Sequence, residues 1–123
     1  MRRFHHESLS KFTLSQKVGN LLFKNHIFTD LSGVHALQHG EQSFQETVIT
    51  HFANRACGGA AMVTCTGVQI NPNIESDGNH LHVNHYTTEE LRSIYELAAR
   101  VHHYGAVASM QLTISTATIS TMQ

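Results

Sequence analysis

The stretch RACGGAAMVTCTGVQINP, residues 55–72, decides the fold because it passes from the end of a helix into a buried strand. Gly58 and Gly59 follow an apolar stripe and are typical of a helix stop. The run AAMVTCTGV that comes next is too short for another helix and is rich in Val and Thr. It predicts a strand buried on both faces, as in parallel sheets. Gly67 stands at the end of this strand.

One amphipathic helix is expected before that strand in the sequence, and another is expected after it. Ser43 precedes an apolar stripe with a spacing of four, so a helix is predicted over 44–57. Thr87 and Glu90 have capping-box spacing, and Gly105 suits a helix end, so a second helix is predicted over 88–104. The apolar positions expected to face the core are Phe44, Val48, Phe52 and Ala56 in the first helix, and Leu91, Ile94, Tyr95, Ala98 and Val101 in the second.

Further strands complete an α/β pattern. Residues 11–25 resemble a hairpin that turns at Gly19 and Asn20, and residues 27–29 are predicted to form the first core strand. AVASMQL, residues 106–112, predicts the third core strand, and residues 71–86 are expected to be a loop. The fold class is therefore an amino-terminal hairpin followed by β-α-β-α-β. Right-handed crossovers place both helices on the same side of a parallel sheet.

Composition excludes several classes of function. The 123 residues, 41% of them hydrophobic, fit one domain with a buried core. Eight Lys and Arg against nine Asp and Glu, without a basic run, predict no nucleic-acid partner. No apolar run approaches the roughly 20 residues that a membrane helix needs, and the start MRRFHHESLS lacks the apolar centre of a signal peptide. We expect a cytoplasmic protein without a membrane partner.

Cysteine and histidine residues give weak signals of their own. Cys57 and Cys65 have no metal-type or disulfide spacing and are interpreted as buried or half-buried thiols. Among the eleven histidines, His80, His82 and His85 raise the alternative of a small zinc-binding module. The run lacks an acidic or cysteine partner at motif spacing, so the preferred interpretation is a histidine-rich loop without a metal.

Four segments in order carry a resemblance to a known family. They are KNHI, GVHALQHGE, HFANRACGGAAMVTCTGVQINP and ARVHHYGAVASMQL, within residues 12–112. This pattern resembles the amino-terminal part of the NADH:flavin oxidoreductases of the old yellow enzyme family, and is most similar to the members like 2,4-dienoyl-CoA reductase. The resemblance implies a TIM (β/α)8 barrel that holds FMN at the carboxyl ends of its strands. It also implies hydride transfer from NADH or NADPH to an activated alkene, an enone or enoyl substrate.

The resemblance also implies which residues contact the flavin. Asp30, Leu31, Ser32 and Gly33 correspond to residues along the flavin ring, and His35 to a loop over the active site. Gly67 corresponds to the small residue beneath the ring, and Gln111 to the glutamine that binds the pyrimidine edge. The residue chemistry supports Gly67 independently, because a position without Cβ lets a flat ligand approach the backbone. A tight turn remains the alternative for this glycine, and no catalytic residue is expected within the chain.

The sequence also departs from the family. Asp30 and Leu31 replace a small pair, so a carboxylate would disfavour an anionic reduced flavin. Lys24-Asn25-His26 replaces the family's Lys-Asn-Arg. The tail over 113–123, TISTATISTMQ, matches nothing in the family, and residues 1–10 are expected to be disordered.

The length of the resemblance predicts a truncated barrel. A minimal barrel needs about 250 residues, so residues 11–112 would hold about three of eight strands. Iron–sulfur cysteines, known in larger members, could lie only in a missing carboxyl-terminal part. The leading hypothesis is the amino-terminal fragment of an FMN-dependent oxidoreductase, and the alternative is a catalytically inactive remnant. An open barrel would also expose a sheet edge through which copies could self-associate.

Overall fold

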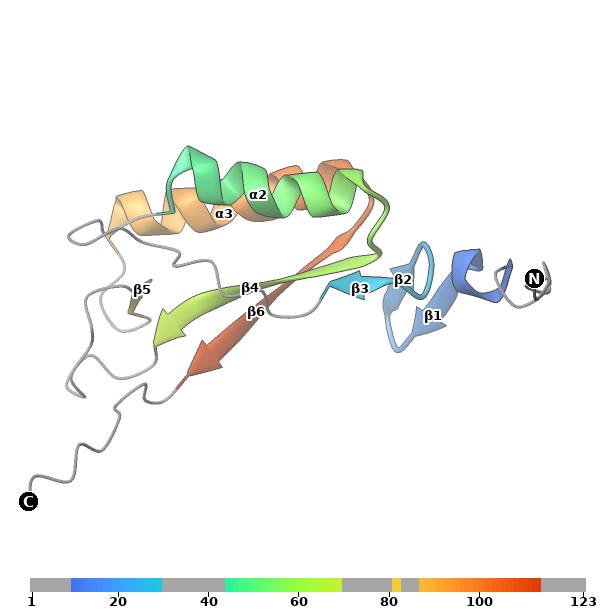
Figure 1. Cartoon of the computed structure of the whole chain (residues 1–123). Helices are drawn as coiled ribbons and strands as arrows, with labels where there is room; N and C mark the ends of the chain where they lie inside the picture. Colours follow the sequence, from blue (N-terminus) through green and yellow to red (C-terminus); the bar gives the residue numbers. More distant parts are fainter. Residues whose placement is uncertain (1–9, 30–43, 70–80, 83–86, 114–123) are drawn as a thin grey trace, which may run out of the picture.

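The structure, a computed structural model, describes residues 10–29, 44–69, 81–82 and 87–113. Two helices lie side by side over one face of a parallel sheet, and a small hairpin lies beyond one end of the sheet (Figure 1). In chain order the elements are η1 (Lys11–Thr13), β1 (Gln16–Val18), β2 (Leu21–Phe23), β3 (Phe28–Thr29), α2 (Glu46–Cys57), β4 (Met62–Gln69), β5 (Leu81–His82), α3 (Thr88–His103) and β6 (Val107–Thr113).

Strand β4 is the centre of the sheet. β3 pairs in parallel with its start, where Phe28 lies opposite Met62, and β6 pairs in parallel along the other edge. The predicted parallel order of the three core strands, with both helices on one face, is confirmed.

One short strand was not predicted. β5 pairs in parallel with Val68 and Gln69 of β4. The same two residues also pair with β6, so β5 lies on the β3 edge, farther toward the carboxyl end of β4. The prediction of a loop throughout 71–86 is therefore wrong at Leu81–His82, because two residues are too short to show a period.

Helix α2 buries the predicted stripe. Val48, Phe52 and Ala56 are all buried against the sheet and α3. The helix begins at Glu46 with Gln45 as its N-cap, two residues later than the sequence indicated. Phe44 precedes the helix, yet its side chain is only 3% exposed, and its N–H donates to Ser93 Oγ at 3.1 Å. Its burial therefore depends on α3 as well as on helix periodicity.

Helix α3 begins at the predicted capping box. Thr87 Oγ1 accepts from the N–H of Glu90 at 3.2 Å, and the Glu90 carboxylate accepts from the N–H of Thr87 at 2.5 Å. Gly105, at φ +66°, follows the end of the helix in the left-handed conformation that glycine allows.

The predicted apolar stripe of α3 is partly wrong. Leu97 and Val101 are buried and Ile94 packs against the same cluster, whereas Leu91 is exposed and the Tyr95 side chain is 77% exposed. Successive helical residues turn by about 100°, so the face through 94, 97 and 101 leaves Tyr95 on the outer side. Packing against α2 selects this face, which includes Leu97, a residue that the predicted stripe omitted.

The core lies between the helices and the sheet. Val63 and Cys65 supply its β4 side, and Ala106, Ala108 and Met110 supply its β6 side. Burial of Cys65 confirms its assignment to packing. Cys57 is exposed at the last turn of α2, so the prediction of a buried or half-buried thiol is wrong for this residue. Met62, also expected in the core, is only half-buried, because it lies on the opposite face of β4.

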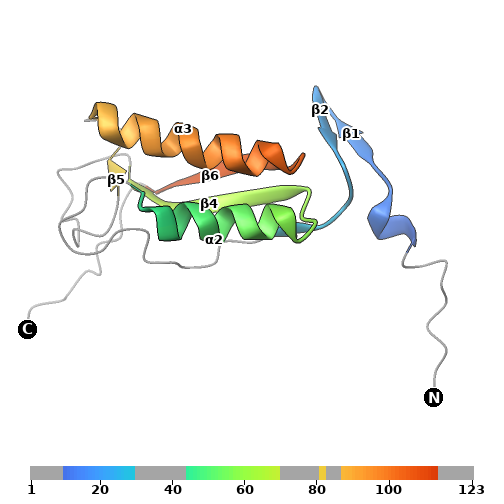
Figure 2. The same ribbon diagram turned by 90° about the horizontal axis from the view of Figure 1, so that it is seen from above.

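The hairpin is attached to the ends of both helices. Lys24 Nζ donates to the carbonyl of Ala56 at 3.3 Å and to that of Tyr104 at 2.7 Å. Asn25 Nδ2 donates to the carbonyl of Gly59 at 2.7 Å. Figure 2 shows β1 and β2 beyond the ends where α2 and α3 finish. Carbonyls at a helix C-terminus carry partial negative charge, so a lysine there is favourable.

Candidate functional site

Gly67 and Gln111 lie together at the carboxyl ends of the two central strands. Cys65 pairs with Met110, and Val68 pairs with Leu112, so two residues of β4, Thr66 and Gly67, face one residue of β6. That register shift is a β-bulge, a feature that is frequent beside active sites. The single residue opposite the bulge is Gln111. The structure thus brings two residues of the expected flavin site side by side.

The face of the sheet that carries Gln111 is the one without helices. Ala106, Ala108 and Met110 pack toward the helices, so the alternate residues of β6, including Gln111, belong to the other face. Gln111 is half-exposed there.

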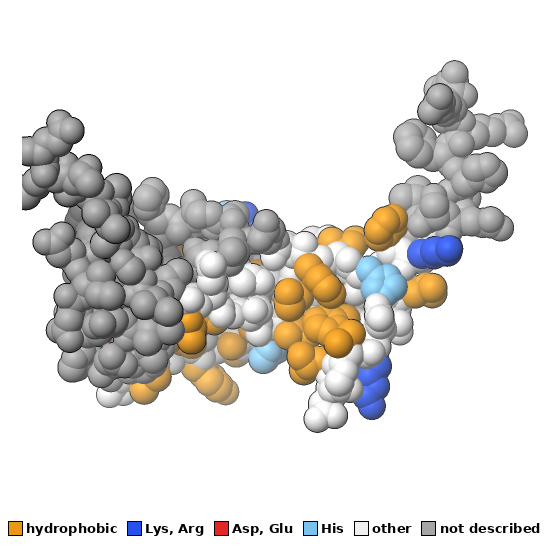
Figure 3. Space-filling model, turned by 90° about the horizontal axis from the view of Figure 1, so that it is seen from below, with side chains coloured by type: hydrophobic (Ala, Val, Ile, Leu, Met, Phe, Trp, Pro, Cys, Tyr) orange, Lys and Arg blue, Asp and Glu red, His pale blue; other side chains and the backbone are white. Residues whose placement is uncertain are grey.

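This helix-free face changes in character along the strands. Its first row is apolar and consists of Phe28, Met62 and Val107, and the next row holds the hydroxyl residues Thr64 and Ser109. Figure 3 views the molecule from this side, and hydrophobic side chains gather where the strands begin. The face therefore becomes polar toward the strand ends that carry Gly67 and Gln111.

Other predicted site residues are not placed. Asp30, Leu31, Ser32 and Gly33, together with His35, lie outside the described residues. His80 and His85 also lie outside them, whereas His82 is in β5. Among the residues that the structure describes, no group of three or more His, Cys, Asp or Glu side chains could hold a metal ion.

Several solved structures have an architecture similar to that of this chain. Old Yellow Enzyme from Pichia sp. AKU4542 matches at 18% identity and a TM-score of 0.70, over 83% of this chain and 26% of that one. The old yellow enzyme from Trypanosoma cruzi matches at 14% identity and a TM-score of 0.71, over 87% and 28%. A complex of 2-naphthoyl-CoA reductase with 2-naphthoyl-CoA matches at 18% identity and a TM-score of 0.72, over 84% and 15%. The chain has an Old Yellow Enzyme-like fold.

The match covers only part of that fold. This chain spans between 15% and 28% of the length of these three structures, so it forms a portion of the TIM barrel. The expected fold class and resemblance are confirmed. No family model and no curated protein matches the sequence. In the described part of the chain, no helix is long and apolar enough to cross a bilayer.

Sequence reasoning missed one set of residues at the carboxyl end of the Old Yellow Enzyme-like sheet. Gln69 pairs with His82 of β5 on one side and with Thr113 of β6 on the other. No local pattern marks these residues, because two strand residues are too short to show a period, and the sequence therefore predicts a histidine-rich loop there.

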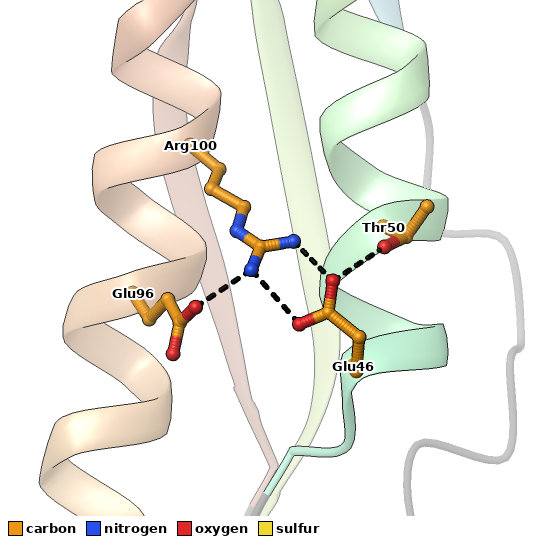
Figure 4. Close-up of polar contacts among 4 residues, drawn as sticks. All are labelled: Glu46, Thr50, Glu96 and Arg100. Atoms are coloured by element: carbon orange, nitrogen blue, oxygen red, sulfur yellow. Dashed lines mark hydrogen bonds and ion pairs between the residues drawn. The ribbon is translucent and has the colours of Figure 1, made fainter.

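A second polar cluster joins the two helices on their outer side (Figure 4). Arg100 Nη2 lies 2.8 Å from Glu46 Oε2 and 2.7 Å from Glu96 Oε1, and Arg100 Nη1 bonds the other oxygen of Glu46. The guanidinium lowers the pKa of Glu46, and the two carboxylates raise the pKa of Arg100. A neighbouring hollow of about 170 Å³ is lined by Thr50, Ala53, Asn54, Arg100, His103 and Tyr104. Two carboxylates already neutralise Arg100, so this cluster stabilises the helix pair rather than binding an anion.

His51 of α2 also has a perturbed pKa, and its main cause is burial rather than an ion pair. Its Nε2 is buried and has no hydrogen-bond partner in the described part of the chain. Burial, with a smaller contribution from Arg55, lowers the pKa of this imidazole. The neutral form is therefore favoured in the folded state.

Proposed function

We propose that this chain supplies the amino-terminal part of an FMN-dependent NAD(P)H oxidoreductase of the ene-reductase type. The observation that carries the proposal is the bulge that sets Gly67 opposite Gln111 at the carboxyl ends of β4 and β6. Ligands of TIM barrels bind at these ends. The Old Yellow Enzyme-like fold supports the reaction class, because one of the matched structures is a 2-naphthoyl-CoA reductase.

The residues at the bulge fit a flavin. Gly67 has no Cβ, so a flat ring can approach the backbone of β4 closely. The amide of Gln111 can donate and accept at once, as the pyrimidine edge of a flavin requires. Bound FMN would supply hydride transfer from the nicotinamide to an activated alkene. The part of this chain would be to hold and orient the ring, since no described residue of the site is placed to deliver a proton.

Activity of the isolated chain is expected to be absent. Within the described residues the outer edge of β6 has no partner strand, and the sheet face that would line the barrel is uncovered. The phosphate of a ligand in a TIM barrel is commonly held after the seventh and eighth strands. We infer that the chain alone binds FMN weakly, is purified colourless and does not oxidise NADH.

An FMN titration of the purified chain, followed by flavin fluorescence, tests the proposal. We expect weak, saturable binding that Gln111→Leu reduces by about tenfold, because a half-buried hydrogen-bonding group is lost. Gln16→Leu, an exposed position on β1, is the matched control and should bind as the wild type does. Binding that ignores Gln111→Leu, or no binding at all, would refute the proposed flavin site. A yellow monomer that turns over NADH would refute the expected inactivity.

A further inference from the structure

Helix α3 has an apolar flank that neither α2 nor the sheet covers. Leu91 and Tyr95 lie one turn apart, and their side chains are 51% and 77% exposed. Ala98, which is half-buried, continues this flank along the helix. A surface helix ordinarily presents one apolar stripe to its core and polar residues to solvent. The apolar surface of α3 is therefore wider than its contacts with α2 and the sheet require.

The direction of this flank follows from helix geometry. Arg100 points toward α2, because its guanidinium bonds Glu46 of that helix (Figure 4). Leu91 precedes Arg100 by nine residues, and nine steps of about 100° place it about 180° around the helix from Arg100. Leu91, with Tyr95 one turn later, therefore lies on the flank of α3 that faces away from α2.

The same side of the molecule carries the free edge of the sheet. α3 packs on β6, and α2 packs on β4 (Figure 2). β6 pairs with β4 along one edge, and within the described residues its other edge presents unpaired backbone groups. The outer edge of β6 and the flank of α3 with Leu91 and Tyr95 therefore form one surface, here called the β6–α3 edge. It offers hydrogen-bonding groups in the sheet layer and apolar side chains in the helix layer.

The architecture of the chain indicates what such an edge accepts. β6 lies beside β4 in parallel, and α3 lies beside α2, so the strand layer and the helix layer grow in the same direction. One further parallel strand with its helix would continue both layers at once. The three matched structures are much longer than this chain, which spans 15% to 28% of them, and a closed barrel gives each strand a neighbour on both sides.

We propose that the β6–α3 edge binds a β-α unit of a second polypeptide. The strand of that unit pairs in parallel with β6, and its amphipathic helix covers Leu91 and Tyr95. Tyr95 is the central contact, because an aromatic side chain buries a large apolar area and tyrosine is enriched among the residues that dominate interfaces. The partner is thus defined by its chemistry: an uncharged strand followed by a helix with an apolar stripe.

A second copy of this chain fits the β6–α3 edge less well. The copy would continue the two layers with the flank of α2 that faces away from α3. Arg55 lies nine residues after Glu46, which faces α3, so Arg55 is on that outer flank. The copy would therefore set a guanidinium, rather than an apolar stripe, against Leu91.

A synthetic β-α peptide is the probe. It consists of a strand of about six Val and Thr residues, a Gly and Ser linker, and a helix of about 14 residues with one leucine stripe. The peptide is titrated into the isotope-labelled 123-residue chain and followed by amide chemical shifts. We expect saturable binding, with shifts in β6 and on the Leu91 flank of α3.

Two matched variants test the helix contact. Tyr95→Lys should weaken peptide binding by about tenfold, because it places a charge in an apolar contact. Tyr104→Lys, the same change beside the hollow between the helices, should leave the dissociation constant within twofold. Circular dichroism shows whether each variant is folded, and Leu91→Ala gives an independent variant if Tyr95→Lys unfolds.

Four results would overturn the proposal. They are no saturable binding of the β-α peptide, equal loss of binding in the two tyrosine variants, equal binding of a peptide that contains the strand alone, and loss of self-association in Tyr95→Lys without peptide. The last result, measured by sedimentation velocity, would assign the flank to a second copy. The surface does not involve FMN, so failure to bind FMN with retained peptide binding would refute the flavin proposal alone, and the reverse result would refute only this interface.

Discussion

The charged side chain of Lys24 contacts the C-terminal ends of two helices. Its ammonium group donates to the carbonyls of Ala56 and Tyr104, at the ends of α2 and α3, and the Ala56 carbonyl also accepts from the N–H of Gly59. The sequence marked this residue only as part of a motif with an altered third position. The structure shows that its role lies in assembly, at the opposite end of the strands from the candidate site.

Replacing this lysine should destabilise the fold without altering ligand binding. We expect Lys24→Met to lower the free energy of unfolding by about 1 kcal/mol, because the helix ends lose a favourable charge and two hydrogen bonds. Lys17→Met, on exposed β1, is the matched control and should have little effect. Chemical denaturation monitored by circular dichroism gives both values. Equal effects of the two variants would show that general charge, and not the contacts of Lys24, is responsible.

His51 should make stability depend on pH. Burial lowers its pKa from the ordinary value of 6.5, so the folded state binds this proton less readily than the unfolded state does. Its contribution is fully present above about pH 6.5 and is lost as the pH falls from there through the folded pKa. We expect His51→Gln to reduce the loss of stability between pH 7.5 and 5.5.

A second histidine variant is needed as a control, because the chain has eleven histidines and the others can also contribute to the pH dependence. His103→Gln, an exposed position at the end of α3, should retain the pH dependence of the wild type. Unfolding midpoints at the two pH values measure the difference. An unchanged pH dependence in His51→Gln would assign the effect to other groups.

At the scale of elements, the ends of the helices follow from short sequence signals. The capping box of α3 joins Thr87 and Glu90, and glycines follow the ends of both helices. These features involve neighbours within a few residues, so the sequence alone defines them.

The capping box can be tested with adjacent threonines. Thr87→Ala should cost about 1 kcal/mol of stability, because the N–H of Glu90 loses its acceptor. Thr88→Ala changes an exposed position in the first turn and should be neutral or slightly stabilising, since alanine has the higher helix propensity. Thermal unfolding distinguishes the two variants, and a greater loss in Thr88→Ala would contradict the assigned cap.

Elements that depend on distant partners were harder to predict. The order of the strands placed Gly67 near Gln111, because parallel strands end at one edge of the sheet. The bulge between them was not predicted, since it arises from a mismatch of one residue between two strands. The pair of Glu46 and Arg100 depends on the offset between two helices, and no local pattern encodes that offset.

At the scale of the whole molecule, the described residues form an open sheet with helices over one of its faces. On the helix-free face Phe28 is exposed and Met62 and Val107 are half-buried, and β6 has no outer partner strand within the described residues. A partly exposed apolar row beside a free edge favours pairing with another copy. We expect the chain to self-associate as its concentration rises, which sedimentation velocity can follow.

A charge on the sheet should oppose this association. Val107→Lys places a lysine on the edge strand and is expected to shift the chain toward monomer. Leu91→Lys, on the exposed side of α3, is the matched apolar-to-lysine control and should leave association unchanged. A wild-type chain that remains monomeric at all concentrations would contradict the prediction, as would an equal effect of the two variants.

The Lys24 contact also has a consequence for synthesis on the ribosome. Lys24 and Tyr104 are 80 residues apart, so the hairpin emerges long before its second helix end has been translated. Translation proceeds at about 5–20 residues per second, which leaves the hairpin with an incomplete anchor for several seconds. The hairpin therefore leaves the exit tunnel well before α3 yet is fixed in place only when α3 is complete, and a nascent chain interrupted before Tyr104 would retain a loosely held hairpin.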